Sequence, residues 1–325
     1  MTTIAKLARL LALLFFTGLL SPGLLLAQSD SIRVTLLGTG APNPLPDRFG
    51  AATLVEAGSQ KLLFDAGRGV TIRLNQIGLP MREVTGVFIT HFHSDHLTGL
   101  ADLWLTSWLP PNFGRRTVPL KVWGPVGTST ITSGIESAYS ADIAIRIIDE
   151  NRPEEAAAFD VTEYETGRVI FEVDGVTVTA FEVDHGALIK PAFGYRIDYA
   201  DRSVVISGDT RFDERLIAAA DGADVVIHEV AAFHEDLIDV NPDMQNILDH
   251  HTSPVEAGTV FDRVGPRLAV YSHIVRPPAP GLPAVSIESL IEQTRATYDG
   301  PLVAGVDLMV IEIGDEITVH EPSQN

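Results

Sequence analysis

The chain has 325 residues, of which 45% are hydrophobic and 20% charged, a composition that predicts a folded globular protein and excludes extensive disorder. Acidic residues outnumber Lys and Arg by 43 to 23, so the formal net charge is −20 and the average surface repels polyanions. This charge balance disfavours nucleic acid as a partner. The absence of cysteine excludes disulfides, thiolate metal ligands and cysteine nucleophiles.

Residues 1–27 predict a secretory signal peptide. Lys6 and Arg9 precede an apolar run over residues 10–20, which is shorter than the roughly 20 residues that a membrane span needs. We therefore expect a periplasmic or secreted protein with no stable membrane anchor after processing. The mature chain, residues 28–325, contains no linker that would divide it, so a single domain is expected.

Short apolar runs between turn signals predict two groups of strands. The first group covers residues 32–37, 52–57, 61–64 and 84–90. The second group covers residues 118–123, 176–183, 193–199, 203–207, 225–229, 267–272 and 308–313. Helical patterns begin at residue 70 and cover residues 211–220 and 287–298. This order predicts an α/β protein in which two sheets pack face to face and are covered by helices.

Metal-ligand side chains are concentrated in residues 91–96, which read HFHSDH and follow a predicted strand directly. His91 and His93 can converge on one ion while Asp95 and His96 turn toward a second. The alternative is a polar turn with incidental histidines. Four ligand-type residues in six positions make a metal site the stronger interpretation.

This HxHxDH motif resembles the signature of the metallo-β-lactamase-fold hydrolases, and the flanking sequence resembles their ribonuclease Z and zinc arylsulfatase-like branch. Motifs in that branch's order continue along nearly all of the mature chain: LLGTG at 36–40, LFDAG at 63–67, WGP at 123–125, VDHG at 183–186, SGDT at 207–210, IHE at 227–229, HTS at 251–253 and SHI at 272–274. The resemblance implies an αββα sandwich with a two-zinc site along one edge.

Carried over motif by motif, the resemblance implies seven metal ligands at the ends of predicted strands. They are His91, His93 and His185 for the first zinc, Asp95, His96 and His273 for the second, and Asp209 as the bridge. Histidine nitrogens and carboxylate oxygens suit zinc, although other divalent transition metals also bind such donors. Taken alone, His185 reads as a surface turn residue and Asp209 as a helix cap.

Four further residues are candidates for supporting and catalytic roles. Asp65 is expected to accept a hydrogen bond from a ligand imidazole, with a turn aspartate as the even alternative. Glu229 is expected to orient a nearby histidine. Asp95 would orient the attacking water, and His251 would protonate the leaving oxygen. Residues 253–256, SPVE, predict a capped helix start directly after this histidine.

Candidate substrate contacts lie near the ligand motifs in sequence. Trp104 and Trp108 follow the HFHSDH segment, and aromatic side chains often line binding sites. Their spacing is also typical of a helix packed into a core, so at most one is expected in the pocket. Lys190 and Arg276 are candidate anion contacts, although each alone reads as a surface cation.

Three activities fit these residues. The signal peptide and aromatic segment favour an exported dinuclear-zinc hydrolase of small sulfate or phosphate esters, which is an arylsulfatase-like activity. Its partner would be a small-molecule substrate, and a homodimer is one assembly that the chain could form. The first alternative is a ribonuclease Z-like phosphodiesterase or tRNA 3′-endonuclease. Residues 141–175 oppose it, because they contain ten acidic residues and three arginines where a basic arm would grip RNA. The second alternative is a β-lactam or lactone hydrolase.

Overall fold

The computed structural model describes residues 30–279, 281 and 283–322. The predicted signal peptide, residues 1–27, lies outside the described residues, so the predictions of export and of a single mature domain stay predictions. Within the described part of the chain, no helix combines the length and apolar character needed to cross a membrane.

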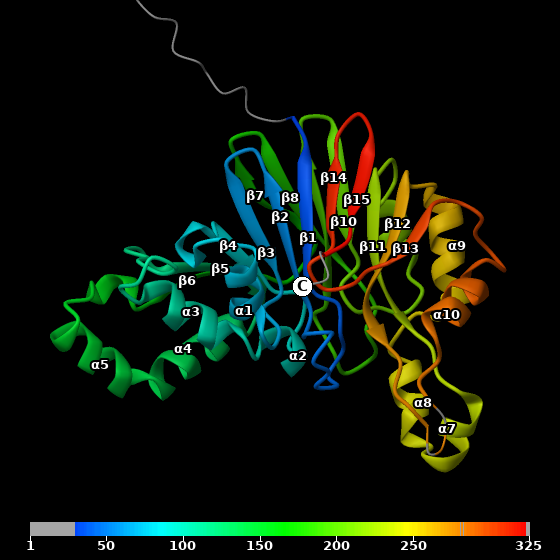
Figure 1. Ribbon diagram of the computed structural model, residues 1–325, viewed down its shortest axis with the longest axis horizontal. Coiled ribbons are helices and arrows are strands. Elements are labelled where there is room, and N and C mark those ends of the chain that lie inside the picture. Colours follow the sequence, from blue (N-terminus) through cyan, green and yellow to red (C-terminus); the bar gives the residue numbers. More distant parts are fainter. Residues whose placement is uncertain (1–29, 280, 282, 323–325) are drawn as a thin grey trace, which may run out of the picture.

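Two mixed β-sheets form the centre of the molecule (Figure 1). The first, in spatial order, consists of β15 (Ile317–His320), β14 (Val310–Ile313), β1 (Ile32–Gly38), β2 (Ala52–Ala57), β3 (Gln60–Phe64), β4 (Gly86–Phe88), β5 (Leu120–Pro125) and β6 (Phe159–Tyr164). The second consists of β13 (Leu302–Ala304), β12 (Leu268–Val275), β11 (Val225–Ala231), β10 (Arg202–Ile206), β9 (Phe193–Tyr199), β8 (Val176–Glu182) and β7 (Arg168–Val173).

Helices cover the outer faces of the sheets and extend from both ends of the molecule (Figure 1). On the side of the first sheet lie α1 (Val70–Gln76), α2 (Ser94–Leu97), α3 (Leu100–Trp108), α4 (Thr128–Ala138) and α5 (Ser140–Asp149). On the side of the second lie α6 (Glu214–Ala219), α7 (Glu235–Val240), α8 (Asp243–Leu248), α9 (Pro254–Val264) and α10 (Ile287–Thr294). Short 3-10 turns occur at Met81–Glu83 and Glu154–Ala156. The predicted αββα sandwich is confirmed.

Alternating side chains of the strands explain the layers. In β1, Val34 and Leu36 point into the core between the sheets, whereas Leu37 packs under the helices of the first sheet. In β11, Ile227 joins the core between the sheets and Val226 joins the core under the outer helices. Because strand side chains alternate between faces, a sheet covered on both sides needs apolar residues at successive positions.

Parallel strands place the loops of the HFHSDH and SGDT motifs at one edge of the sandwich. Strands β3, β4 and β5 run parallel in the first sheet, and β10, β11, β12 and β13 do so in the second. The carboxyl ends of parallel strands meet at the same sheet edge, where ligands bind in open α/β sheets. Loops from both sheets therefore meet at this edge.

Aromatic packing fixes the strand ends that lead into these loops. Phe64 ends β3 and Phe88 ends β4, and their rings stack with centroids 5.0 Å apart. The Tyr195 hydroxyl donates a hydrogen bond to the carbonyl oxygen of Ile89. Gly67 lets the HFHSDH loop approach, because a Cβ atom there would lie 2.4 Å from the backbone oxygen of Asp95.

The sequence prediction differs from the structure where strands or helices are only partly buried. The predicted strand 84–90 is shortened to β4, because Val84 closes a 3-10 turn and Thr90 donates its backbone N–H to the Asp65 carboxylate instead of to a neighbouring strand. Elements that the sequence does not predict include β6, β7, α4 and α5. Their sequences mix polar and apolar residues, and α5 has no fully buried residue. The predicted helix start at Ser253 is confirmed by a complete capping box.

Candidate metal centre

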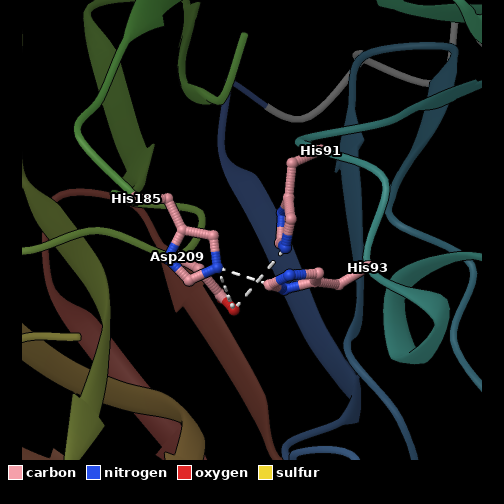
Figure 2. Close-up of side chains that lie close together, drawn as sticks. All are labelled: His91, His93, His185 and Asp209. Atoms are coloured by element: carbon pink, nitrogen blue, oxygen red, sulfur yellow. Dashed lines mark hydrogen bonds and ion pairs between the residues drawn. The ribbon is translucent and has the colours of Figure 1, made fainter. Parts of the chain in front are cut away.

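Two adjoining groups of side chains have their donor atoms within 4.8 Å of one another. The first contains His91, His93, His185 and Asp209, which converge from one loop of the first sheet and two of the second (Figure 2). The second contains Asp95, His96 and His273. The structure therefore brings together all seven residues that the sequence nominated as metal ligands.

Asp209 occupies the middle of this arrangement. Its Oδ2 atom lies 3.3 Å from His96 Nε2, 3.4 Å from His273 Nε2 and 3.7 Å from His185 Nε2. It also lies 3.8 Å from His91 Nε2. A single carboxylate thus faces imidazoles of both groups, which is the position that a bridging ligand requires.

Hydrogen bonds at the outer ring nitrogens fix the orientation of three imidazoles. Thr90 Oγ1 donates to Asp65 Oδ2 at 2.9 Å and accepts from His91 Nδ1 at 3.0 Å. Asp65 Oδ2 also accepts from His96 Nδ1 at 2.7 Å. The backbone oxygen of His250 accepts from His185 Nδ1 at 2.8 Å. Protonated Nδ1 atoms leave the Nε2 lone pairs directed at Asp209.

The charge states of His91, His185 and Asp209 suit a cation, whereas His96 must lose a proton to bind one. Burial lowers the pKa of His185 to about 4 and, with the neighbouring imidazoles, holds the pKa of His91 well below its usual range. Burial opposes ionisation of Asp209, but the surrounding histidines outweigh it and hold the pKa of its carboxyl well below normal. Burial likewise lowers the pKa of His96, yet Asp209 and Asp65 raise it well above its ordinary value.

Several donor atoms at the centre have no hydrogen-bond partner among the described residues. They are His91 Nε2, His96 Nε2 and Asp209 Oδ1, and all are buried. Unpaired buried polar atoms are costly unless another group satisfies them. Neutral imidazole nitrogens and a carboxylate oxygen are donors that a divalent transition metal, zinc above all, accepts. The residues present therefore fit a metal.

Backbone strain accompanies two of these residues. Asp65 has φ of 59° and His273 has φ of 43°, both in the left-handed region that non-glycine residues rarely adopt. Such conformations cost of the order of 1–3 kcal/mol and are concentrated at functional sites. Both residues direct side chains toward the same centre, since Asp65 bonds His96 and His273 Nε2 lies 3.1 Å from Asp95 Oδ2.

Replacing Asp65 by asparagine is expected to weaken zinc binding roughly 10- to 100-fold, because the amide no longer fixes the tautomer of His96 with a charged acceptor. Zinc affinity measured by competition with a chelator tests this. Asp102→Asn is the matched control, because Asp102 bonds Thr71 and Thr106 on α1 and α3 instead of a site histidine. Equal zinc affinity in Asp65→Asn and wild type would contradict the assigned role.

Glu229 and His251 form a buried pair beside the centre. Glu229 Oε2 accepts from His251 Nδ1 at 3.0 Å, and Glu229 Oε1 accepts from the backbone nitrogen of Thr252 at 2.8 Å. Burial lowers the pKa of His251, but the Glu229 carboxylate outweighs burial and raises it to about 9. The His251 ring stacks on His273 with centroids 5.6 Å apart. Glu229 is thus placed to orient this histidine.

A cavity of about 490 Å³ opens onto the centre. His93, Asp95, Asp209, His251 and His273 contribute to its lining. Much of the remaining lining is apolar and includes Leu45, Phe233, Met244, Ile247, Val275 and Pro277. A cavity that combines apolar side chains with a few polar groups is typical of a ligand-binding site.

The predicted substrate contacts separate into two groups. Arg276 lines the cavity. Trp104 and Trp108 are buried in the core around α3, where Trp104 stacks on Phe159 at 4.8 Å, so the structure does not bring them to the cavity. Lys190 lines a separate hollow beside Glu182 and does not reach the centre. The helical spacing of the two tryptophans therefore reflects core packing.

Several residues that line the cavity were not predicted from the sequence. Arg48 lines the cavity and donates from Nη1 to Thr39 Oγ1 at 2.7 Å and to the Gly305 oxygen at 2.8 Å. Its only sequence signal is its place in the loop after the LLGTG motif. Phe233, Met244 and Ile247 lie on or beside two short helices that the sequence did not predict, and no spacing signal distinguishes them.

Fold and site together define a metal-dependent hydrolase of the metallo-β-lactamase fold. The model of the beta-lactamase superfamily domain matches residues 60–274. Ribonuclease Z of Mycobacterium bovis is 35% identical over 288 residues, which cover 87% of this chain and 98% of that protein. Ribonuclease Z of a Mycobacterium species is 37% identical over 255 residues, covering 77% and 86% of the two chains. The chain belongs to the ribonuclease Z family within the β-lactamase superfamily.

Solved structures support the fold. Human tRNase Z, short form, has a TM-score of 0.63 at 23% identity and covers 87% of this chain and 99% of its own. The metallo-beta-lactamase fold protein YhfI from Bacillus subtilis has a TM-score of 0.67 at 16% identity, with 87% and 100% covered. The predicted family and the predicted metal-dependent hydrolase acting on ester bonds are confirmed. The metal is divalent and typically zinc in this fold.

Two expectations are wrong. The relatives are ribonucleases Z, which overturns the exported arylsulfatase-like hydrolase of small esters and favours the first alternative. The same relatives overturn the exclusion of nucleic acid as a partner. Net charge was a poor guide, because it averages over the whole surface whereas phosphates meet a local field. The acidic residues within 141–175 lie in α5, β6, β7 and the segments that join and follow them, and none of them lines the cavity.

Proposed function

We propose that this chain is a ribonuclease Z-type phosphodiesterase that cleaves RNA, with precursor tRNA as its substrate. The observation that carries the proposal is the 35% identity to Mycobacterium bovis ribonuclease Z across 98% of that protein. The geometry supports it, since seven convergent donor atoms suit two zinc ions. His91, His93 and His185 would hold one ion, Asp95, His96 and His273 the other, and Asp209 both.

Bound zinc would lower the pKa of a shared water toward neutrality and neutralise charge on the phosphate oxygens. Asp95 lines the cavity, where its carboxylate would orient the attacking water. This water would give one proton to bulk solvent and add to phosphorus as the bond from phosphorus to the leaving oxygen breaks. His251 donates its proton to that oxygen, and Glu229 holds the ring in place through Nδ1.

Two arginines bring positive charge to the cavity despite the acidic surface. Arg48 and Arg276 line it, and neither forms an ion pair with any described residue, although Asp47, Asp95 and Asp209 also lie on the wall. Burial lowers the pKa of Arg48, the nearby guanidinium of Arg276 lowers it further, and the carboxylates of Asp307 and Asp47 act in the opposite direction. Two guanidinium groups in one cavity suit a phosphate, since guanidinium pairs well with its oxygens.

The proposal predicts salt-sensitive cleavage of precursor tRNA that depends on these arginines. The substitution Arg276→Met is expected to raise KM roughly tenfold at low salt and to flatten the dependence of kcat/KM on salt, because one phosphate contact is lost. Arg295→Met is the matched control, since Arg295 bonds backbone oxygens near Tyr298 and does not line the cavity. The assay uses the zinc-loaded full chain. An unchanged salt slope in Arg276→Met would contradict the phosphate contact, and an absence of cleavage by wild type would contradict the function.

A further inference from the structure

The LLGTG motif at residues 36–40 supplies no metal ligand, yet its threonine is fully buried among polar groups. Thr39 Oγ1 donates to Asp307 Oδ1 at 2.8 Å and accepts from Arg48 Nη1 at 2.7 Å. The backbone nitrogen of Thr39 also donates to Asp307 Oδ1, at 2.9 Å. One hydroxyl thus links a carboxylate from the loop between β13 and β14 to a guanidinium that lines the cavity.

Asp307 holds this arrangement from a second direction. Its Oδ2 atom accepts from the backbone nitrogen of Phe49 at 2.8 Å and from Arg73 Nη2 at 2.8 Å. The Arg73 guanidinium lies 4.0 Å from the centre of the Phe49 ring. Because Phe49 follows Arg48 directly, the Asp307 carboxylate fixes both the side chain of Arg48, through Thr39, and the backbone next to it.

The charges around Arg48 leave its guanidinium available to an anion. Asp307 already forms an ion pair with Arg73, at 2.8 Å, and Asp47 lines the cavity without pairing with Arg48. Arg48 is only 8% exposed and bonds Thr39 and a backbone oxygen through Nη1. Among the described residues, none accepts a hydrogen bond from its Nε or Nη2 atom. A buried cation with free donors is costly unless a ligand engages it, and phosphate oxygens match the guanidinium fork.

Thr39 also connects this arginine to the metal centre. Its backbone oxygen accepts from the backbone nitrogen of Ile274 at 3.0 Å, and Ile274 follows the candidate ligand His273 in β12. The residue that holds the guanidinium is therefore bonded to the strand that carries a metal ligand. This connection keeps the separation between Arg48 and the metal centre constant.

We propose that Thr39 and Asp307 are positioning residues that hold Arg48 beside the metal centre, where its guanidinium binds a phosphate of the RNA. This inference rests on the proposed function and deepens it. Neither Thr39 nor Asp307 lines the cavity, so each acts through the arginine. A guanidinium that is already held in place loses less conformational entropy on binding, so the pair strengthens phosphate binding without contacting the substrate.

The test is Thr39→Val in the zinc-loaded full chain, which removes the hydroxyl but keeps a side chain of similar size and the backbone bonds of residue 39. We expect KM for precursor tRNA to rise roughly fivefold with little change in kcat or zinc content, because Arg48 keeps its charge and loses its fixed position. The decrease of kcat/KM with added salt should become less steep. Threonine is neutral, so its removal alters this salt dependence only through a charged group. Thr39→Ser restores the hydroxyl and should bind precursor tRNA nearly as tightly as wild type.

A double substitution shows whether Thr39 acts through the arginine. Arg48→Met should raise KM roughly tenfold, and adding Thr39→Val should change KM no further, since residues that act through one another are not additive. Thr294→Val is the matched control, because the Thr294 hydroxyl is also buried but bonds Tyr271 and Leu290 away from the cavity. It should lower the melting temperature and leave KM and the salt dependence as in wild type.

Arg48→Lys tests the inference without altering Thr39 or Asp307, so it serves even if Thr39→Val does not fold. Lysine keeps the positive charge but lacks the planar fork that bonds Thr39 on one side and a phosphate on the other. We expect Arg48→Lys to raise KM nearly as much as Arg48→Met. A lysine variant that matches wild type would overturn the inference, because charge alone would then be sufficient.

Two results with Thr39→Val would also overturn the inference. The first is a KM and a salt dependence equal to those of wild type. The second is an equal rise in KM in the wild-type and Arg48→Met proteins, because Thr39 would then act independently of the arginine. Either result with a wild type that cleaves precursor tRNA leaves the proposed function intact, whereas a wild type that cleaves no RNA overturns both.

Discussion

Replacing Asp209 by alanine is expected to remove most of the bound zinc and to lower the rate of RNA cleavage by roughly a thousandfold or more. The Asp209 carboxylate lies within 3.8 Å of four imidazole nitrogens that belong to both donor groups. Its loss therefore removes a donor from each ion, and metal ions contribute several kcal/mol to such reactions. Zinc per chain by elemental analysis and kcat/KM on the same sample measure the effect.

The control for this prediction is Asp224→Ala. Asp224 accepts hydrogen bonds from Ser203 and Arg267 at the opposite end of β10 and β11, so its removal tests the loss of a carboxylate without touching the centre. The Asp224→Ala protein should have a lower free energy of unfolding but keep its bound zinc. Full zinc content and full activity in Asp209→Ala would show that this carboxylate bridges nothing.

Replacing His251 by glutamine is expected to lower kcat about 10²- to 10⁴-fold while zinc content stays unchanged. A proton donor held beside the leaving oxygen accelerates the reaction by about this factor. His251 sits between the cavity and Glu229, with its Nδ1 already bonded, so only Nε2 remains for the leaving oxygen. Single-turnover rates on precursor tRNA measure the chemical step.

His250→Gln is the matched control, because the neighbouring His250 also lines the cavity and its hydrogen bond to His185 comes from its backbone oxygen, which the substitution keeps. It should change kcat little. His251 can also be grouped with Asp209 and His273 by distance. If His251→Gln loses zinc in proportion to its activity, this histidine is a ligand and the assignment as proton donor is wrong.

The resemblance of the motifs to a known family implied the ligand set, and most candidates follow an apolar strand closely, whereas His273 lies within β12. The HFHSDH segment follows β4, and Asp209 follows β10 after two residues. Parallel strands bring their carboxyl ends to one edge of the sheet, so the positions of these ligands in the sequence agree with the topology of the fold. The partnership of Glu229 and His251 was foreseen only as a general role, since no spacing rule places a strand residue beside a loop 22 positions later.

The cavity wall could not be predicted in the same way. A helical pair such as Trp104 and Trp108 has the same spacing whether it faces a core or a pocket. The packing of Phe159 against Trp104 shows that this pair faces the core. Arg48 and Phe233 both reach the cavity from loops, which have no periodicity to read. Overall acidity misled the choice of substrate, because net charge does not show that Arg48 and Arg276 line the cavity.

The central claim is that this metal centre cleaves RNA. The most direct measurement strips the full chain with a chelator, titrates zinc back, and follows cleavage of precursor tRNA together with bound zinc. We expect no cleavage by the stripped protein. The rate of precursor tRNA cleavage should then rise with added zinc and saturate at about two zinc ions per chain. Precursor tRNA that stays intact with the zinc-saturated protein would contradict it.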